Sequence, residues 1–353
     1  MPETTTVIEN PTQSIENPTQ SRPADTSAIT VPVITVPVIT VIVPTFRRTG
    51  QLLECLAALA GQTLPPAKVI VVVRDEDQET RTALARWYGP QPTITTVKRP
   101  GQTHAMNSAL RDAIGDIVAF TDDDAVPRAD WLERLAEHYR DQTVGGVGGK
   151  VIVPRQTAAG SDPRLPVGAV TRTGRPLGNH HLGDGPARDV LWLKGVNMSY
   201  RRSLCGFDES LRGRGAQVAN DSDIALRIHA AGWRIVYDPA AAVDHFAGPR
   251  FDADARGRQS VQAMRDAVFN ETLVLLRWLR GWRRPAAVAY LFAVGVPRGP
   301  GPLGAIKAAL SGRRSARDAL LDSAHSTAAR VSAVGRWIAE RKTVTTPPPP
   351  HDV

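Results

Sequence analysis

Short apolar runs alternate with amphipathic segments in the first third of the chain, and this alternation restricts the fold more than any other feature. The predicted strands are the runs Val69–Val73, Thr93–Val97 and Ile117–Phe120. One predicted helix, around Leu52–Leu59, comes before the first of these runs, and two others, around Thr80–Tyr88 and His104–Ile114, lie between them. Buried strands separated by helices are typical of a parallel sheet that is covered on both faces. We therefore predict a doubly wound α/β fold with a mostly parallel central sheet flanked by helices.

The carboxyl ends of these strands are where we expect a ligand, because doubly wound sheets bind ligands there. The relevant positions come just after Val43, Val73 and Phe120. Residues 145–150, Gly-Gly-Val-Gly-Gly-Lys, look like a phosphate loop, but Val151 stands where a Ser or Thr would hold Mg²⁺. A strand rather than a helix is predicted to follow this segment, so we do not expect a phosphate loop.

Composition and cysteine usage limit the class of protein and its compartment. The 353 residues are 42% hydrophobic and 22% charged, as in a soluble globular chain. The two cysteines, Cys55 and Cys205, form no C-x-x-C pair, which predicts a reducing compartment. Residues 1–25 lack a basic region followed by an apolar core, so we expect no secretory signal and a cytoplasmic location.

The pattern divides the chain into four regions. Residues 1–35 repeat the segments IENPTQS and VPVIT, which predicts a disordered tail. Residues 36–250 contain the alternation of strands and helices, and residues 251–342 are predicted to form a basic helical extension. The Pro-rich residues 343–353 are predicted to be a second disordered tail.

The excess positive charge is confined to the extension and its flanks. The net charge is +8, and from Arg250 onward 17 Lys and Arg stand against 8 Asp and Glu. A nucleic-acid-binding enzyme more often surrounds its working surface with basic residues, so nucleic acid is not an expected partner.

Two interpretations of the basic extension remain open. Nine basic residues and no acidic one lie between Arg277 and Arg317, with Trp278 and Trp282 among them. The apolar run Pro285–Pro297 is too short to span a bilayer, but a peripheral helix on the inner face of an anionic membrane fits the pattern. A helical extension packed against the preceding region, with a solvated basic face, fits it equally well.

An acidic run directly follows one of the predicted strands. Asp122, Asp123 and Asp124 come after Phe120, and three adjacent carboxylates repel one another unless a cation neutralises them. Oxygen ligands of this kind suit Mg²⁺ or Mn²⁺. The alternative is a solvated turn in which Asp124 helps to cap the next helix.

Two further features lie downstream of this run. Asp221 and Asp223 open an amphipathic helix, where capping of the helix N-terminus is the simplest role for a carboxylate. His245 follows Asp244 just past the strand-like run Trp233–Tyr237, and a single histidine is more often structural than a ligand. The order in which the three features occur favours a functional interpretation.

That order resembles the family 2 glycosyltransferases, which have the GT-A fold and use nucleotide sugars. The matching segments, between about residues 38 and 250, are Val41–Arg48, Gln62-Thr63, Val69–Val73, Gly115–Asp124, Gly195–Arg202, Gly206–Glu209, Asn220–Asp223 with Arg227 and Gly232, and Asp244-His245. Each motif is weak evidence alone, but the ordered set is specific. The resemblance implies an inverting transferase that moves a sugar from a nucleotide-diphosphate donor to a hydroxyl of a glycan or lipid-linked acceptor.

The resemblance also implies roles for individual residues. A divalent cation, Mn²⁺ or Mg²⁺, would be bound by Asp122, Asp124 and His245, and Asp221 would be the catalytic base. The donor would be bound by Pro44, Thr45, Arg47, Asp75, Asn107, Asp122 and Asp123. The acceptor would be bound by Trp192, Asn197 and Asn220.

Some positions depart from the family pattern. Asp75 stands in an Arg-Asp-Glu-Asp run in place of the usual turn, Met106 replaces an Arg, and Asn220 replaces an acidic residue before Asp221. His180-His181 lie in a long Gly- and Pro-containing loop, for which a lid or an acceptor-recognition role is a better prediction than a second metal site. The alternative to an enzyme is a non-catalytic GT-A-like protein that binds a nucleotide sugar or glycan at a membrane surface.

Overall fold

The computed structural model describes residues 36–154, 162–248, 251 and 260–344. All of these belong to one unit that begins at Val36. The predicted tail 1–35 lies outside the described residues, as do residues 345–353 of the second predicted tail. Residues 343 and 344 of that tail are instead the last residues of the long helix α9 (Ala316–Val344).

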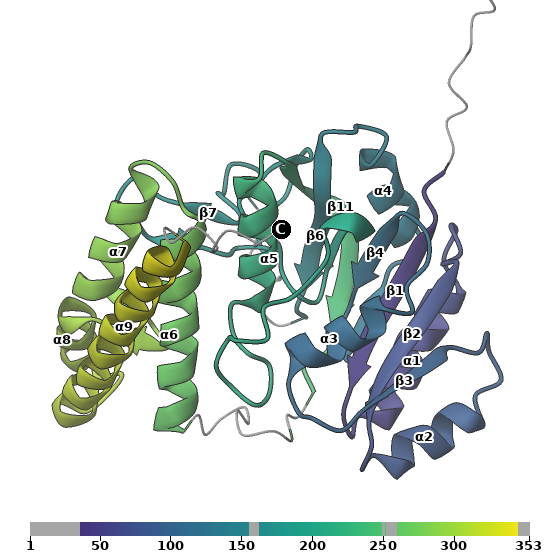
Figure 1. Cartoon of the computed structure of the whole chain (residues 1–353), viewed down its shortest axis with the longest axis horizontal. Helices are drawn as coiled ribbons and strands as arrows, with labels where there is room; N and C mark the ends of the chain where they lie inside the picture. The colour runs from purple at the N-terminus through teal and green to yellow at the C-terminus, as the bar shows by residue number, and fades with distance from the viewer. Residues whose placement is uncertain (1–35, 155–161, 249–250, 252–259, 345–353) are drawn as a thin grey trace, which may run out of the picture. The chain divides into compact units, whose positions relative to one another are not determined.

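A large sheet forms the centre of this unit (Figure 1). Its strands are β1 (Ile39–Thr45), β2 (Lys68–Arg74), β3 (Thr93–Val97), β4 (Ile117–Phe120), β5 (Ala125–Pro127), β6 (Val144–Ile152), β9 (Arg188–Asp189), β10 (Met198–Arg201) and β11 (Arg234–His245). The strand order is β3-β2-β1-β4-β10-β6-β11-β5, and β9 also pairs with β11. The strands β3, β2, β1 and β4 are mutually parallel, as are β6 and β11, whereas β10, β5 and β9 run antiparallel to their neighbours. The predicted α/β architecture is confirmed.

Helices cover both faces of the sheet because its central strands are apolar on both faces. They are α1 (Thr49–Ala60), α2 (Gln78–Ala85), α3 (Gln102–Leu110), α4 (Trp131–His138) and α5 (Asn220–Ala230). Val41 and Val43 of β1 pack in one core cluster with side chains of α1 and α4. Ile42, which points to the opposite face, packs in another cluster with side chains of α3 and α5. This alternation follows from the two-residue period of a strand.

The glycine-rich segment 145–150 lies inside strand β6, which agrees with the expectation that it is not a phosphate loop. A Cβ atom on Gly149 would lie 1.8 Å from the carbonyl oxygen of Ala241, and one on Gly148 would lie 2.4 Å from that of Asn197. These glycines therefore allow neighbouring backbone to approach β6 closely. The long loop that follows contains the short strands β7 (Ala169–Val170) and β8 (Pro176–Leu177), which pair with each other.

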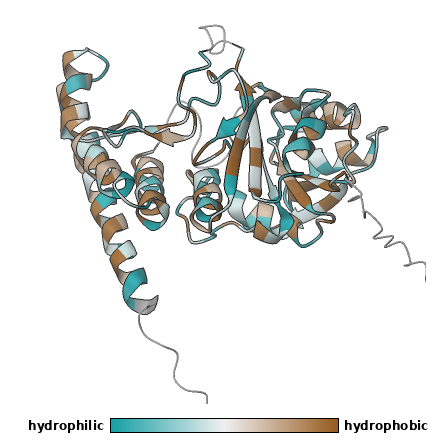
Figure 2. Ribbon diagram, turned by 90° about the horizontal axis from the view of Figure 1, so that it is seen from above, coloured by the Kyte–Doolittle hydropathy of each residue, from teal (hydrophilic) through white to brown (hydrophobic). Residues whose placement is uncertain are grey.

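The basic extension is helical, as predicted, and it packs on the preceding region. It contains α6 (Val261–Trp278), α7 (Arg283–Ala293), α8 (Pro302–Leu310) and α9, with the short strand pair β12 (Gly295–Val296) and β13 (Gly299–Pro300). Asn270 of α6 is fully buried and bonds through its side chain to the backbone of Arg212 and Val218. In Figure 2 the long helix α9 shows hydrophobic and hydrophilic turns in alternation along its length.

Trp278 does not serve as the membrane-facing side chain that a peripheral extension would use. Its indole N–H donates to Asp223 Oδ1 of α5 at 2.7 Å, so it faces the region that precedes the extension. Trp282 is 51% exposed and stays available for another contact. Among the described residues, no helix combines the length and the apolar composition needed to cross a bilayer.

A charged cluster fixes α6 to its surroundings. Arg277 contacts Asp208 at 2.7 Å and Glu340 of α9 at 2.6 Å. Hydrogen bonds from Arg277 are the main reason why the pKa of Glu340 lies below its ordinary value. Burial alone would raise the pKa of Asp208, but hydrogen bonds from Ser210 and Arg277 lower it overall. The cluster links three separate segments of the chain.

Replacing Arg277 with Gln should lower the free energy of unfolding by about 1–3 kcal/mol, because two partly buried carboxylates lose their charged partner. Both carboxylates have depressed pKa values in the folded state, so this stabilisation is present above their unfolded pKa values and is lost as the pH falls through the folded ones. The difference in melting temperature between wild type and variant should therefore shrink between pH 7 and pH 3. An Arg280→Gln variant, at an exposed neighbouring position, is the control, and an equal difference at both pH values would contradict the assignment.

Candidate functional site

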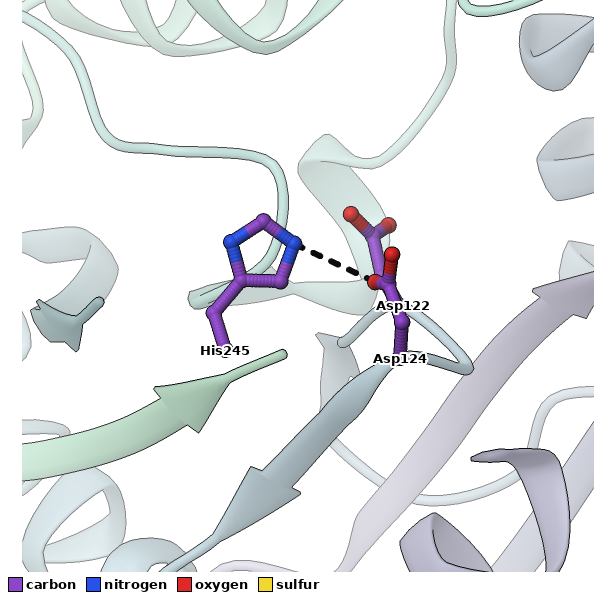
Figure 3. A group of neighbouring side chains, drawn as sticks. All are labelled: Asp122, Asp124 and His245. Carbon is purple, nitrogen blue, oxygen red and sulfur yellow. Dashed lines mark ion pairs between the residues drawn. The ribbon is translucent and has the colours of Figure 1, made fainter. Parts of the chain in front are cut away.

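The pairing of two strands brings three potential metal ligands together. Asp122 and Asp124 follow β4, and β5 begins at the next residue, Ala125, which lies opposite His245 in the antiparallel pair β5–β11. One ligand atom from each of Asp122, Asp124 and His245 lies within 4.8 Å of the others. Figure 3 shows the three side chains directed toward one another. The sheet register therefore places a histidine from the end of β11 beside the acidic turn.

Asp124 is held in the turn by several contacts. Its Oδ1 lies 3.2 Å from His245 Nε2, and its Oδ2 accepts a hydrogen bond from the Gly248 N–H at 2.9 Å. Its backbone oxygen accepts from the Phe246 N–H at 2.9 Å. Burial would raise the pKa of Asp124, but His245, Arg48 and the Gly248 N–H together lower it to about 2. The carboxylate is therefore ionised at neutral pH.

Arg48 supplies the positive charge that stabilises this acidic turn. Its guanidinium contacts Asp123 at 2.5 Å and Asp124 at 2.7 Å. The Thr45 hydroxyl also donates to Asp123, at 2.6 Å. Asp123 is fully buried, and burial raises its pKa to about 7 despite the opposing effect of Arg48 and Thr45. Asp123 and Thr45, predicted donor contacts, are thus bonded to each other inside the turn.

The role of Arg48 was not predicted from the sequence, although the neighbouring Arg47 was predicted to bind the donor. Arg47 is exposed, has a positive φ of 57°, and donates its backbone N–H to Asp77 Oδ2 at 2.6 Å. A signal for this role was present in the sequence. Basic residues follow β1 and acidic residues follow β4, and these two strands are neighbours in the sheet. A neighbouring basic residue is the natural neutralising partner of three carboxylates.

The donor set of Asp122, Asp124 and His245 fits a divalent cation. Two carboxylates and an imidazole provide oxygen and nitrogen ligands of the types that Mn²⁺ and Mg²⁺ accept. Asp122 and His245 are only partly buried, whereas Asp124 is fully buried. The cluster therefore offers a cation two accessible ligands and one that is fixed within the protein.

The other predicted donor contacts lie at the ends of neighbouring elements. Pro44 is partly buried near the end of β1, and Asp75 follows β2, where its carboxylate pairs with Arg81 at 3.0 Å. Asn107 of α3 uses its amide to bond the backbone of Phe207 and the carboxylate of Glu209. Asn107 therefore fixes the loop that follows β10.

Asp221 lies on the first turn of α5 and lines a cavity of about 210 Å³. Its Oδ2 accepts from the Gly195 N–H at 3.1 Å and lies 3.8 Å from Lys194 Nζ. Its Oδ1 accepts from the Ser222 N–H at 2.8 Å. This bond to the N–H of the next residue is not an N-cap, since Asp221 lies inside α5 and no side chain caps that helix, so the capping role is not confirmed; the carboxylate also reaches the loop that precedes β10.

One short segment connects this cavity to the acidic turn. The Gly195 N–H contacts Asp221, and the carbonyl of the next residue, Val196, accepts from the Thr121 hydroxyl at 3.0 Å. Thr121 is followed directly by Asp122 in the chain. The predicted base and the candidate metal ligands are therefore linked through the segment 195–196 and the end of β4.

The walls of the cavity come from three parts of the chain. Trp192 and His180 belong to the long loop region, and the His180 ring lies 3.0 Å from the Trp192 carbonyl. Burial is the main cause of the lowered pKa of His180, about 4, so this histidine is neutral at pH 7. Glu271, Val274 and Leu275 of α6 complete the wall. Glu271 was missed, because it lies in the extension and outside every motif.

Two residues that are predicted to contact the acceptor, Asn197 and Asn220, form hydrogen bonds inside the protein. Asn197 is fully buried; its amide donates to the carbonyls of Lys150 and Ala241, and its oxygen accepts from the Trp131 indole. These bonds give the Asn197 side chain partners inside the protein, and its contact with an acceptor stays a prediction. Asn220, the first residue of α5, is largely buried and donates to the Ala216 and Gln217 carbonyls, which ties the start of the helix to the preceding turn.

The sequence matches the family model described as "Glycosyltransferase like family 2" over residues 37–260. The pre-mycofactocin glycosyltransferase of Mycobacterium tuberculosis is 28% identical over 211 residues, which cover 58% of this chain and 42% of that protein. The succinoglycan biosynthesis protein ExoM of Rhizobium meliloti is 30% identical over 220 residues, covering 57% of this chain and 64% of that protein. The chain thus spans between two fifths and two thirds of the length of these relatives.

Solved structures with the same fold include two glycosyltransferases. A mannosyltransferase of Pyrobaculum calidifontis, in complex with GDP-Man and Mn²⁺, matches with a TM-score of 0.53 and 24% identity, covering 85% of this chain and 88% of that one. GalNAc-T7 with UDP, GalNAc and Mn²⁺ matches with a TM-score of 0.54 and 15% identity, covering 91% of this chain and 60% of that one. These likenesses confirm the predicted GT-A fold.

Replacing Arg48 with Gln should lower the free energy of unfolding by about 3–5 kcal/mol, because it removes the counter-charge of two buried carboxylates. The exposed Arg47→Gln variant is the matched control and should change stability by about 0.5 kcal/mol or less. Urea denaturation of the two variants measures the difference. Equal stability of the two would show that Arg48 does not support the acidic turn.

Mn²⁺ should raise the melting temperature of the wild type, since a ligand that binds the native state stabilises it. Asp122→Asn and His245→Gln should each weaken this effect by at least about tenfold in metal concentration. His138→Gln is the control, because His138 forms a similar pair with Asp238 at 2.8 Å away from the cluster. A Mn²⁺ response that survives in both site variants would exclude the three-ligand site.

Proposed function

The chain belongs to the family described as glycosyltransferase-like family 2, and on that premise we propose that it transfers a sugar from a nucleotide-diphosphate donor to an acceptor hydroxyl with inversion of configuration. The observation that carries this proposal is the link between Asp221 and the acidic turn through residues 195–196. It connects a carboxylate that lines a cavity with a cluster that fits a divalent cation.

The donor binds where the strand ends meet the acidic turn. Asp122, Asp124 and His245 would hold a divalent cation, which would neutralise negative charge on the departing diphosphate when bound. Arg48 stabilises the acidic turn through its ion pairs. Asp123 and Thr45 also support the turn and do not contact the donor directly. The relatives that carry Mn²⁺ with GDP-Man or UDP support a nucleotide donor of this class.

Three other predicted donor contacts stay part of this proposal. Pro44, Arg47 and Asp75 lie at or beyond the carboxyl ends of β1 and β2, where the nucleoside would rest on the sheet edge. Arg47 is exposed and keeps its guanidinium available for the donor. Asn107 contributes by fixing the loop at Phe207.

Asp221 accepts the proton of the acceptor hydroxyl as the hydroxyl oxygen attacks the anomeric carbon. The bond from that carbon to the diphosphate oxygen breaks, and the diphosphate leaves with the electron pair. A positioned carboxylate base contributes about 10²–10⁴-fold to such a step. Because one displacement occurs at the anomeric carbon, the configuration is inverted.

The acceptor enters the cavity beside Asp221. Trp192 offers an aromatic wall, and Lys194 and Glu271 offer polar groups for hydroxyls of a glycan or of a lipid-linked sugar. Burial raises the pKa of Glu271, with Arg298 and Arg330 opposing the shift. We further propose that the reaction takes place in the cytoplasm, at the inner face of the membrane that holds the acceptor.

Replacing Asp221 with Asn should lower turnover by about 10²–10⁴-fold, because an amide cannot accept the proton. Donor binding should change little, since Asn retains an oxygen for the Gly195 N–H. Turnover is measured as nucleoside diphosphate released from a panel of UDP- and GDP-sugars in the presence of glycan acceptors. Asp223→Asn is the matched control, because Asp223 lies two residues away and bonds to Trp278 instead.

Three results would contradict this proposal. A turnover of Asp221→Asn close to that of the control would assign the base to another group. Retention of the anomeric configuration in the product, measured by proton NMR, would exclude the single displacement. Nucleotide binding without turnover by the wild type on any acceptor would favour the non-catalytic alternative.

A further inference from the structure

Helix α8 presents its bulky apolar side chains to solvent and its small side chains to the protein. Leu303, Ile306 and Leu310 are 58%, 52% and 85% exposed. Ala305, in contrast, is 1% exposed, and a Cβ on Gly304 would lie 2.1 Å from the Val294 carbonyl oxygen. An ordinary amphipathic helix buries its large apolar residues, so the arrangement of α8 is reversed.

The exposed residues of α8 form one continuous stripe. Positions 303, 306 and 310 are spaced by three and four residues, so they lie on the same face of the helix. Leu320 and Leu321, in the first turns of α9, are also exposed, at 63% and 48%. We call residues 302–321 the α8–α9 corner. Isolated exposed apolar residues need no explanation, but a stripe of this kind marks an interaction surface.

The α8–α9 corner is also strongly basic. It contains Lys307, Arg313, Arg314 and Arg317, all exposed, and a single acidic residue, Asp318. The Asp318 carboxylate accepts from the Ser315 hydroxyl at 2.7 Å, and Arg314 pairs with Asp322 just outside the corner. The apolar stripe therefore belongs to a segment with an excess of exposed positive charge.

We propose that the α8–α9 corner docks on an anionic lipid bilayer, with Leu303, Ile306 and Leu310 inserted at the level of the headgroups. Basic residues beside exposed Leu and Ile side chains provide both contributions that a peripheral membrane helix needs. A second copy of this chain fits less well, because joining two such surfaces would bring the cations of both copies together. The docking does not depend on the proposed sugar transfer.

Sedimentation of the full chain with vesicles tests this docking directly. The chain should bind vesicles of phosphatidylglycerol and phosphatidylcholine at low salt, and bind pure phosphatidylcholine weakly. Binding should fall steeply toward 1 M salt, where the Debye length is about 3 Å instead of about 10 Å at 0.1 M. A residual salt-resistant fraction should come from the apolar stripe.

Two triple variants separate the contributions. Lys307→Gln with Arg313→Gln and Arg317→Gln should weaken partitioning on the order of 100-fold, or about fivefold per basic residue. Leu303→Ser with Ile306→Ser and Leu310→Ser should weaken it by about tenfold or more and remove the salt-resistant fraction. All six side chains are exposed, and circular dichroism confirms that the variants fold.

Matched controls remove the same charge and apolar area elsewhere. Arg86→Gln with Lys98→Gln and Arg111→Gln lowers the net charge equally, and Tyr88→Ser with Ile94→Ser and Ile114→Ser removes three exposed apolar side chains. Both controls should bind vesicles like the wild type.

The proposal is overturned if the wild type does not sediment with anionic vesicles, or if the corner variants bind as well as their controls. It is also overturned if the serine variant abolishes a dimer of the wild type without affecting vesicle binding. Mn²⁺ and nucleotide binding, measured separately, report on the catalytic proposal alone.

Discussion

Arg48 pairs its partly buried positive charge with both Asp123 and Asp124, and the geometry of the acidic turn depends on these ion pairs. Burying neighbouring carboxylates is costly unless a cation and hydrogen bonds compensate for the lost hydration. Arg48 can provide this compensation because β1, which it follows, pairs directly with β4. Without it, Asp123 would gain a proton more readily, and the turn would lose the shape that holds Asp122 and Asp124 beside His245.

The second requirement is the register of β5 with β11. His245 lies opposite Ala125, so a shift of one residue would turn the imidazole to the other face of the sheet. The backbone of residues 246 and 248 also bonds to Asp124, which ties the end of β11 to the turn. The cluster is therefore produced by two strand pairings and one ion-pair network.

The sequence allowed the α/β fold, the acidic turn and its convergence with His245 to be predicted, because strand periodicity and motif order record backbone topology. The direction in which individual side chains point was harder to predict from the sequence. Asn197 lies within a motif, yet its amide bonds Trp131, Lys150 and Ala241, which are distant in sequence. Arg47 and Arg48 are adjacent and chemically identical, and only the positive φ at Arg47 and the turn after β1 decide which of them faces the carboxylates. Such choices depend on tertiary contacts that no local pattern encodes.

The C-terminal extension forms part of the wall of the cavity beside Asp221, in addition to the exposed surface of the α8–α9 corner. Asp221 and Asp223 lie on one turn of α5, yet Asp221 contacts Gly195 and the cavity while Asp223 accepts from Trp278 of α6. A further part of α6 supplies Glu271, Val274 and Leu275 to the cavity wall. The match to the family ends at residue 260, before this wall begins. The family match therefore includes the turn and the carboxylate, whereas α6, which lies beyond the match, supplies one part of the cavity wall beside Asp221.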